Sequence, residues 1–454
     1  MPDALLDRLA CPRCDRTPLV AAGDGHRCPA CRTEFGALRG IPWLFAEPDA
    51  ARGEWRNRLN FELSRLARAS DGLRRELGRD GLRPPTRRRL ERHLAGTDAQ
   101  RRALMQLLGP LDVAPDDSVF ESHLALRTRL PADQGLYTYY ANVHRDWCWG
   151  EAENAASLEQ VRAVAPESPG NVLVLGAGAG RLAYDLHQVL GPARTIALDF
   201  NPLLALVADT VTRGESLELW EFPLAPRTAD DVAVPRRLAA PARVRDGLHF
   251  VLGDVLRAPF RPGAFDTVVT PWLIDIVSEE LPVFAARVNR LLATGGRWIN
   301  FGSLAFDRPA HAERYGPEEV LAIVQESGFG ALRAAEAVIP YLCSPASRHA
   351  REERVFTFRA VKADEAPAPA RHRALPDWLV TGQEPVPLSE SFRTQAVTTR
   401  IHAFLMSLID GRRTLEDMAA LMEKEKLMPR AEAMTALRGF LARMLDDSRR
   451  GRGF

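Results

Sequence analysis

Two closely spaced cysteine pairs lie near the start of the sequence. Cys11 and Cys14 form one pair and Cys28 and Cys31 the other, with two residues inside each pair and thirteen between the pairs. Each pair can present two sulfurs to one metal, and a hairpin between them returns the chain to it, which is the arrangement of a four-thiolate zinc site. The alternative is four free structural cysteines. Because four thiolates fill a tetrahedral site, we expect a zinc ion with a structural role.

Three alternating glycines, Gly176, Gly178 and Gly180, follow the apolar run "NVLVL" and precede a helical pattern that begins near Arg181. A dinucleotide-binding loop has the spacing G-x-G-x-x-G, and its helix N-terminus faces a pyrophosphate. The spacing here is G-x-G-x-G, which is typical of class I S-adenosylmethionine enzymes, where the backbone approaches the methionine and ribose. A tight turn without a ligand is the alternative. We therefore expect S-adenosylmethionine as the cofactor.

An acidic residue ends each of the next two predicted strands. Asp199 in "TIALDFN" is placed to accept hydrogen bonds from two ribose hydroxyls. Asp254 in "LGDV" is placed where this fold reads the adenine amino group, and Val255 supplies the next backbone amide. The alternatives are a helix cap for Asp199, because Asn201-Pro202 starts a helix, and an ordinary turn aspartate for Asp254.

Short apolar strands alternate with helical stretches from residue 170 onward. They are predicted at "NVLVLG", "RTIALDF", "LHFVLGDV", "FDTVVTPW", "RWINFGSL" and "ERVFTFRAV". Such alternation implies parallel pairing through βαβ crossovers. We expect an α/β fold with a doubly wound, mainly parallel, seven-stranded Rossmann-like methyltransferase sheet. A Pro-rich insertion at about 212–246 lengthens one crossover, and insertions of that length tend to be functional or disordered.

The sequence divides into five parts. We expect a zinc ribbon at 1–47, a helical connector at 48–130 and the methyltransferase domain at 131–362. A Pro/Ala linker at 363–376 leads to a small helical module, winged-helix in one interpretation, at 377–454.

Charge and hydropathy narrow the functional class. The net charge of +1 gives no general case for nucleic-acid binding. The arginine-rich stretch "PPTRRRLERHL" is expected to be a solvated helix face, with an RNA-binding patch as the alternative. The sequence contains neither an apolar segment of membrane-spanning length nor a secretory signal pattern in its first ten residues. We therefore expect a cytoplasmic protein without membrane contact.

The segments "HRDW", "VLVLGAGAGRLAYDL", "WEFP", "GDV", "LID" and "GGRWINFGSL" occur in the order found in the carnosine N-methyltransferase family. Residues 137–362 resemble that family, which methylates a ring nitrogen of the imidazole in a dipeptide. The resemblance implies that Asn142, where the family more often has Gln, and Arg145 line the cofactor pocket. On the residues alone, Arg145 could equally be a packing residue.

The same resemblance implies that Asp275 is a catalytic and substrate-binding residue. A neutral imidazole nitrogen is already nucleophilic, so its methylation needs placement and tautomer control more than a strong base. Asp275 could supply both by accepting a hydrogen bond from the far ring N–H. The alternative is that Asp275 caps the helix in "VSEELPVF".

Two segments depart from the family pattern. Asp307 in "NFGSLAFDR" stands where the family has a substrate-binding histidine, and "SRHAREERVF" replaces a tyrosine-rich stretch. We therefore expect a methyl acceptor other than carnosine itself: another imidazole, amine or peptide, with Asp307 among the substrate-binding residues.

The two ends of the chain suggest partners. "LLDRLACPRC", the second cysteine pair and "RGIPWLF" resemble the small zinc-ribbon activator subunit of tRNA and translation-factor methyltransferases. "LIDGRRTLEDMAALM" resembles winged-helix modules that bind leader peptides, with a plain helical packing domain as the alternative. The main hypothesis is an N-methyltransferase for a small molecule or peptide, with a possible protein partner at the C-terminal module. An RNA or translation-protein methyltransferase and a non-catalytic cofactor-binding zinc scaffold are the alternatives.

Overall fold

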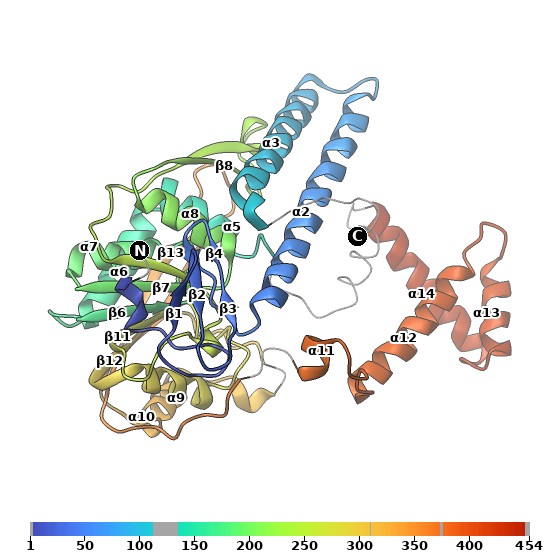
Figure 1. Ribbon diagram of the computed structural model, residues 1–454. Helices are drawn as coiled ribbons and strands as arrows, with labels where there is room; N and C mark the ends of the chain where they lie inside the picture. The colour runs from blue at the N-terminus through green and yellow to red at the C-terminus, as the bar shows by residue number, and fades with distance from the viewer. Residues whose placement is uncertain (1–2, 112–134, 309, 373–375, 450–454) are drawn as a thin grey trace. The chain divides into compact units, whose positions relative to one another are not determined.

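The computed structural model describes residues 3–111, 135–308, 310–372 and 376–449. The chain forms two compact units, of which unit 1 contains the described residues up to 372 and unit 2 those from 376 onward (Figure 1). In the part of the chain that the structure describes, no helix has both the length and the apolarity needed to cross a membrane.

A seven-stranded sheet lies at the centre of unit 1, in the order β10-β7-β6-β11-β12-β14-β13. The strands are β6 (Asn171–Leu175), β7 (Arg194–Asp199), β10 (Leu248–Leu252), β11 (Phe265–Pro271), β12 (Leu292–Gly302), β13 (Phe329–Tyr341) and β14 (Arg351–Lys362). The first five in the order pair in parallel, and β14 is antiparallel to both of its neighbours. The predicted doubly wound, mainly parallel sheet is confirmed, although no predicted strand corresponded to β13.

Helices cover both faces of this sheet and bury one hydrophobic cluster on each. On one face lie α6 (Glu151–Val164), α7 (Arg181–Leu190) and α8 (Pro202–Thr212). On the other lie α9 (Leu281–Leu291) and α10 (Pro317–Glu326). The carboxyl ends of the parallel strands therefore meet along one open edge, where doubly wound folds bind their ligands. Short 3₁₀ turns occur at Gly109–Leu111, Asp230–Val232, Val255–Arg257 and His311–Glu313.

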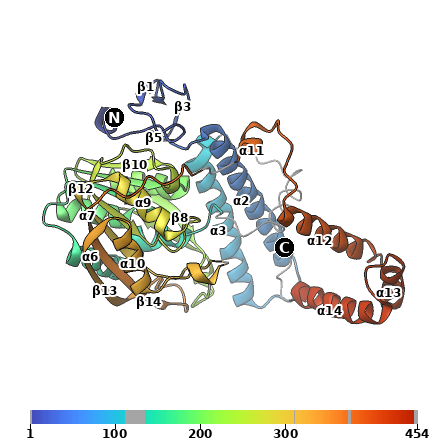
Figure 2. The ribbon, with the colours of Figure 1, turned by 90° about the horizontal axis from the view of Figure 1, so that it is seen from below.

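Two long helices, α2 (Pro48–Leu77) and α3 (Pro84–Leu108), pack side by side in the stretch for which the sequence predicts a helical connector (Figures 1 and 2). The insertion forms the hairpin of β8 (Leu217–Glu221) and β9 (Val234–Leu238), and α3 packs against it. Gly96 permits this approach, because a Cβ there would lie 2.6 Å from the Cβ of Ala233. The remainder of the connector, residues 112–130, lies outside the described residues.

The ribbon begins with α1 (Asp3–Leu6) and continues as two small antiparallel sheets. Its strands are β1 (Val20–Ala22), β2 (Gly25–Arg27), β3 (Glu34–Phe35), β4 (Ala37–Leu38) and β5 (Ile41–Pro42). The segment after β5 runs beside the edge strand β10, where Trp43 forms a parallel bridge with Leu252 (Figure 2). Leu44 N–H donates to the Leu252 carbonyl over 2.7 Å. The ribbon thus extends the edge of the central sheet and contributes side chains to both of its cores.

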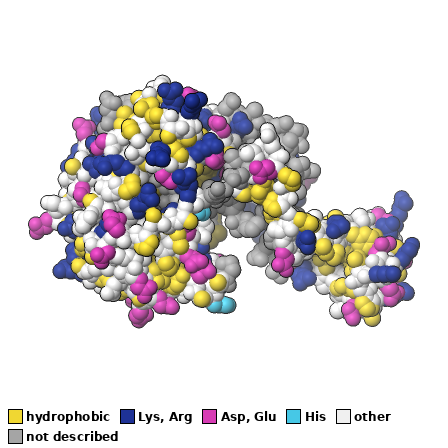
Figure 3. Space-filling view, turned by 60° about the horizontal axis from the view of Figure 1, so that its bottom comes forward, with side chains coloured by type: hydrophobic (Ala, Val, Ile, Leu, Met, Phe, Trp, Pro, Cys, Tyr) yellow, Lys and Arg dark blue, Asp and Glu magenta, His cyan; other side chains and the backbone are white. Residues whose placement is uncertain are grey.

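Unit 2 consists of α11 (Asp377–Thr381), α12 (Glu390–Ser407), α13 (Leu415–Lys424) and α14 (Arg430–Arg449). Its small core contains Leu408, Met418, Ala419, Met422, Ala433 and Leu437. Residues 376–449 contain no strand, so the wing of a winged-helix module is absent from the described part of this unit. Several large hydrophobic side chains are exposed on it, among them Phe392 and Ile401, and apolar side chains are visible there in Figure 3.

Charged side chains of both signs are scattered over the face of unit 1 in Figure 3. This distribution agrees with the net charge of +1. A protein with so little net charge has no long-range attraction to nucleic acid as a whole.

Candidate functional site

The glycine loop joins β6 to α7 and adopts a backbone that requires glycine. Gly176, Gly178 and Gly180 have φ values of +67°, +58° and +86°. A Cβ on Gly180 would also lie 2.7 Å from the Cβ of Ala208, and one on Gly176 would lie 2.8 Å from a methyl carbon of Leu273. The left-handed backbone at all three positions, with crowding at Gly176 and Gly180, favours glycine over other residues. The loop therefore brings its main chain to the open edge of the sheet, directly before the N-terminus of α7.

Asp199 ends β7 beside this loop. Its Oδ2 accepts a hydrogen bond from Gly178 N–H over 2.7 Å, and its Oδ1 accepts one from Asn201 N–H over 2.8 Å. Burial raises the pKa of Asp199 from its ordinary 3.8 to about 6, while N–H groups of Asn201, Gly178 and Phe200 lower it in part. Asn201 is the N-cap of α8, since its side chain accepts from Leu203 N–H. The cap alternative for Asp199 is therefore wrong, and each carboxylate oxygen keeps a lone pair for a ligand.

Asp254 follows β10 at the same edge. It is the N-cap of the 3₁₀ turn Val255–Arg257, and its Oδ1 accepts from Leu256 N–H over 2.8 Å. Burial raises the pKa of its carboxyl group, and the Leu256 hydrogen bond opposes that change. Asp254 thus has the turn role that was the alternative in the sequence analysis. Asp254 and the adjacent Val255 also lie at the sheet edge, where contact with a ligand is possible.

The "HRDW" stretch contains a π-helical turn, Arg145–Trp149, between α5 (Tyr140–His144) and α6. The buried Trp147 donates its indole N–H to the Ala179 carbonyl in the glycine loop over 2.7 Å. Arg181, the first residue of α7, donates to the carbonyl of Asp146 over 2.8 Å. π-helical turns are frequent at functional sites. Here two hydrogen bonds, one donated by the turn and one accepted by it, join the turn to the glycine loop and the start of α7.

The two residues of this helix expected at the cofactor occupy different environments. The Arg145 guanidinium pairs with the Asp146 carboxylate over 2.7 Å and lies over the Tyr341 ring, 5.7 Å from its centre. Asn142 is half-buried in α5, where its N–H donates to the Tyr139 carbonyl. Part of the Arg145 hydrogen-bonding capacity is therefore taken up within the protein.

Asp275 lies in the turn after β11 and is 5% exposed. Its Oδ2 accepts from Ser303 Oγ over 2.6 Å and from Ala305 N–H over 3.0 Å. Its Oδ1 is buried and has no hydrogen-bond partner within the described residues. The N-cap of α9 is Glu280, so the cap alternative for Asp275 is wrong. A buried acceptor without a partner is costly unless a ligand supplies the donor.

Aromatic side chains surround this end of β11. The Trp272 and Tyr341 rings are in contact, with centroids 4.9 Å apart. Tyr139, at the N-cap of α5, has a left-handed φ of 63° and is partly exposed. Burial raises the pKa of the Tyr139 hydroxyl, and the charges of Tyr341, Asp275 and Asp199 raise it further. The Tyr139 hydroxyl is therefore within electrostatic range of both Asp199 and Asp275.

The sequence analysis singled out neither these aromatic residues nor Ser303. Ser303 directly follows β12, at the carboxyl end of a predicted strand next to the one that precedes Asp275, so topology alone could have suggested it. Tyr341 ends β13, which no predicted strand represented. Asp307 is exposed in the loop after β12, and the structure shows no hydrogen bond between it and Asp275.

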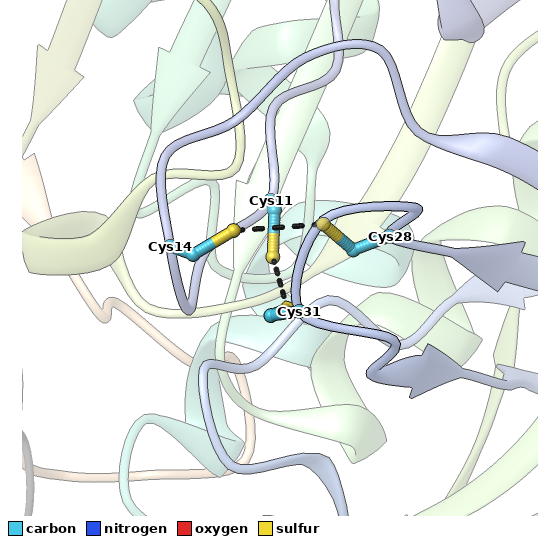
Figure 4. Close-up of side chains that lie close together, drawn as sticks. All are labelled: Cys11, Cys14, Cys28 and Cys31. Atoms are coloured by element: carbon cyan, nitrogen blue, oxygen red, sulfur yellow. Dashed lines mark hydrogen bonds between the residues drawn. The ribbon is translucent and has the colours of Figure 1, made fainter.

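The four ribbon cysteines converge on one point (Figure 4). Their sulfurs all lie within 4.8 Å of one another, with Cys11 to Cys31 at 3.6 Å and Cys14 to Cys28 at 3.5 Å. Zn–S bonds of about 2.3 Å in a tetrahedron place sulfurs about 3.8 Å apart, so the cluster fits zinc. Burial raises the pKa of Cys11, whereas hydrogen bonds with Thr33 and neighbouring cysteines outweigh burial at Cys31 and lower its pKa to about 6.

The ribbon also supports the loop that carries Asp254. A Cβ on Gly253 would lie 2.9 Å from the Leu44 carbonyl oxygen, so the two backbones are in direct contact. Arg257 donates to the carbonyl of Pro12, which lies between Cys11 and Cys14, and pairs with Asp15 over 3.3 Å. The cysteine cluster and the Asp254 turn are thus parts of one packed assembly.

Known proteins agree with this arrangement at the level of the domain. Residues 173–300 match the family model described as a methyltransferase domain. This match covers the glycine loop, the two strand-end aspartates and the turn with Asp275. Residues 173–300 therefore form a methyltransferase domain of the S-adenosylmethionine-dependent class, with S-adenosylmethionine as its cofactor. No curated protein matches the sequence.

Several solved structures are similar to part of the chain. A phosphoethanolamine N-methyltransferase 2 from Haemonchus contortus, bound to phosphomonomethylethanolamine and S-adenosylhomocysteine, shares 15% identity over 52% of this chain and 60% of its own, with a TM-score of 0.33. This chain therefore spans less than two thirds of that enzyme.

Two further structures have similar scores. The N-methyltransferase NodS from Bradyrhizobium japonicum shares 13% identity over 46% of this chain and 94% of its own, with a TM-score of 0.32. A third structure is a chain from the complex between the Haloferax volcanii Trm112 methyltransferase activator and a methyltransferase. It shares 15% identity over 50% of this chain and 96% of its own, with a TM-score of 0.33. At this level of similarity, none of them identifies the methyl acceptor of this chain.

Proposed function

We propose that this methyltransferase acts on a nitrogen of a small molecule or peptide, and that an imidazole ring is the preferred acceptor. The observation that carries the proposal is the carboxylate of Asp275. One of its oxygens is held by Ser303 and Ala305, and the other is buried without a partner. A ring N–H is a donor of the right size and chemistry for that oxygen.

The aromatic walls support a flat acceptor. Trp272 is three residues before Asp275, and Tyr341 packs against it. Aromatic faces favour planar rings and attract positive charge. An imidazole becomes positively charged as it is methylated, so the same walls and the Asp275 carboxylate stabilise the product-like transition state more than the neutral acceptor.

The transfer is a direct displacement. A lone pair on one imidazole nitrogen forms the N–C bond while the S–C bond to the methyl group breaks, and the sulfur retains the bonding pair as S-adenosylhomocysteine. Asp275 accepts a hydrogen bond from the N–H across the ring, which selects the tautomer whose free lone pair faces the methyl group. After transfer, the methylated ring can lose that N–H proton to solvent.

The cofactor half of the proposal rests on the glycine loop. Gly176, Gly178 and Gly180 let the backbone approach the methionine and ribose, and Asp199 accepts hydrogen bonds from the ribose hydroxyls. We assign the adenine end to Asp254 and Val255 and the methionine carboxylate to the remaining Arg145 donors, with Asn142 beside them. Arginine pairs with carboxylates in a bidentate fork.

Labelled methyl transfer tests the proposal. The chain is incubated with methyl-tritiated S-adenosylmethionine and either carnosine, imidazole-free amines or fractionated cell extract. We expect label on an imidazole nitrogen, located by mass spectrometry. Asp275→Asn should lower kcat on the order of 30-fold while the Kd of S-adenosylhomocysteine stays within about threefold. Label confined to other atoms, or a parallel loss of cofactor affinity, contradicts the proposal.

Two matched variants accompany Asp275→Asn. Glu280→Gln changes the exposed N-cap of α9, which forms no side-chain cap hydrogen bond, and should change nothing. Asp307→Asn tests the predicted substrate contact and should raise KM alone if Asp307 binds the acceptor. Transfer of label to RNA, with binding that falls steeply with salt, favours the RNA alternative. Cofactor binding without transfer to any fraction favours the scaffold alternative. A protein partner for unit 2 and a cytoplasmic location stay predictions.

A further inference from the structure

A buried glutamate on α6 holds the turn that follows β13. Glu153 is 4% exposed, and α6 packs against β13. Its Oε2 accepts from Leu342 N–H over 2.8 Å, and its Oε1 accepts from Cys343 N–H over 2.7 Å. Both carboxylate oxygens are therefore bound to the backbone of one turn, 189 and 190 residues away in sequence. Charge-assisted hydrogen bonds of this kind are stronger than those between neutral groups.

The turn needs such support because its backbone is strained. Leu342 has a left-handed φ of 54°, a conformation that leucine rarely adopts. A strained residue keeps this conformation only when its surroundings enforce it, and such residues gather at functional sites. The two hydrogen bonds to Glu153 begin at the strained residue itself, so Glu153 is the group that holds it.

The residue before this turn is Tyr341, which the proposed function makes an aromatic wall of the acceptor site. Tyr341 ends β13 and lies against Trp272, with the guanidinium groups of Arg145 and Arg351 at 5.7 Å and 4.6 Å from its ring centre. The turn follows Tyr341 directly in the chain, so a turn held by Glu153 also fixes the end of β13 that carries the Tyr341 ring. Glu153 thereby connects α6, which is separated by one residue from the π-helical turn, to Tyr341.

We propose that Glu153 is a positioning residue for the methyl acceptor: by fixing the Leu342–Cys343 turn, it holds the Tyr341 ring against Trp272 as one wall of the acceptor pocket. This inference rests on the proposed function for the role of that wall. Glu153 does not touch the acceptor or the cofactor, and its effect passes through the backbone to Tyr341.

Kinetics with carnosine separates positioning from general stability; carnosine serves as an imidazole probe here, although the natural acceptor is expected to differ from it. Glu153→Ala should raise the KM for carnosine at least tenfold, with kcat and the Kd of S-adenosylhomocysteine within about threefold of wild type. Glu153→Gln should be intermediate, because its amide offers one acceptor oxygen and sets an N–H group against the second backbone donor. Glu159→Gln, an exposed change on the same helix, is the matched control and should behave as wild type.

Rescue by glycine makes the test specific. Glycine adopts φ near 54° without strain. Leu342→Gly in the Glu153→Ala background should therefore lower the raised KM at least threefold. If Glu153 merely stabilised the fold, Glu153→Ala would lower thermal stability, and adding Leu342→Gly would not bring KM back toward the wild-type value. Equal losses of kcat and cofactor affinity with an unchanged KM overturn the inference.

A crystal structure of Glu153→Ala with S-adenosylhomocysteine decides the structural step without any acceptor. We expect Leu342 to leave the left-handed region and the Tyr341 ring to leave its 4.9 Å contact with Trp272. If both residues keep their positions, the inference is wrong. If wild-type protein does not methylate carnosine or any imidazole, the proposed function fails, and this structure still shows whether Glu153 positions Tyr341.

Discussion

The proposed cofactor half of the site is centred on one short stretch of the chain, whereas the proposed acceptor half joins side chains at the ends of β11, β12 and β13. Gly176, Gly178, Gly180 and Asp199 lie within one strand-loop-helix-strand unit, and they act mainly through backbone geometry. The group around Asp275 combines a strand-end turn with Ser303 from β12 and Tyr341 from β13. The residue spacing within a short segment therefore determines the cofactor half, whereas the packing of distant elements determines the acceptor half.

Asp199→Ala tests the cofactor half and has the largest expected effect. Two ribose hydroxyls lose a charged acceptor, and hydrogen bonds to charged groups contribute about 1.5–3 kcal/mol each. We expect calorimetry to show affinity for S-adenosylhomocysteine falling on the order of 100-fold. Asp209→Asn, on the following helix α8, is the control, because the Asp209 carboxylate pairs with Arg213 over 2.9 Å. Unchanged affinity in Asp199→Ala would place the cofactor elsewhere.

Removal of zinc tests whether the ribbon belongs to the cofactor half. The Leu44 and Ala10 N–H groups donate to the Leu252 and Pro259 carbonyls on either side of Asp254. Loss of two such hydrogen bonds, about 1 kcal/mol each, would weaken cofactor binding on the order of 30-fold. Metal analysis should find one zinc per chain, and Cys11→Ser should reproduce the effect of a chelator. Cys148→Ser, an exposed cysteine outside the cluster, should not. If the protein without zinc binds the cofactor with full affinity, the ribbon does not contribute to cofactor binding.

The pH dependence of cofactor affinity is the smallest of these effects. In the proposed site, ribose binding requires the ionised Asp199, whose pKa burial raises to about 6. Affinity for S-adenosylhomocysteine should therefore be constant above pH 7 and fall about tenfold by pH 5. Folding has the opposite trend: because the folded pKa is the higher one, the contribution of Asp199 to stability is greatest below pH 4 and is lost as pH rises through 6. Asp199→Asn should abolish both trends, and an unaltered pH profile would assign them to another group.

Local patterns predicted the elements around the proposed cofactor site. The glycine spacing and strand-helix alternation indicated the loop and the sheet, and the cysteine spacing indicated the cluster, because each depends on residues close in sequence. The alternative that Asp199 caps a helix also depended on nearby residues, and it is wrong because Asn201 caps α8.

The acceptor half could not be predicted in the same way. Tyr341 reaches Trp272 only because β14 folds back between β12 and β13, and Glu153 reaches the next turn only because α6 packs on β13. Neither contact leaves a periodic signal in the sequence. The chain's departures from the carnosine N-methyltransferase pattern lie in this half too, at Asp307 and in the stretch before β14, where specificity depends on packing.

A crystal structure with S-adenosylhomocysteine tests the central claim most directly, namely that one continuous site joins Asp199 to Asp275. We predict the ribose hydroxyls on the Asp199 carboxylate and the sulfur directed toward the space between Asp275, Trp272 and Tyr341. A ribose bound away from Asp199, or a sulfur separated from Asp275 by protein side chains, would contradict it.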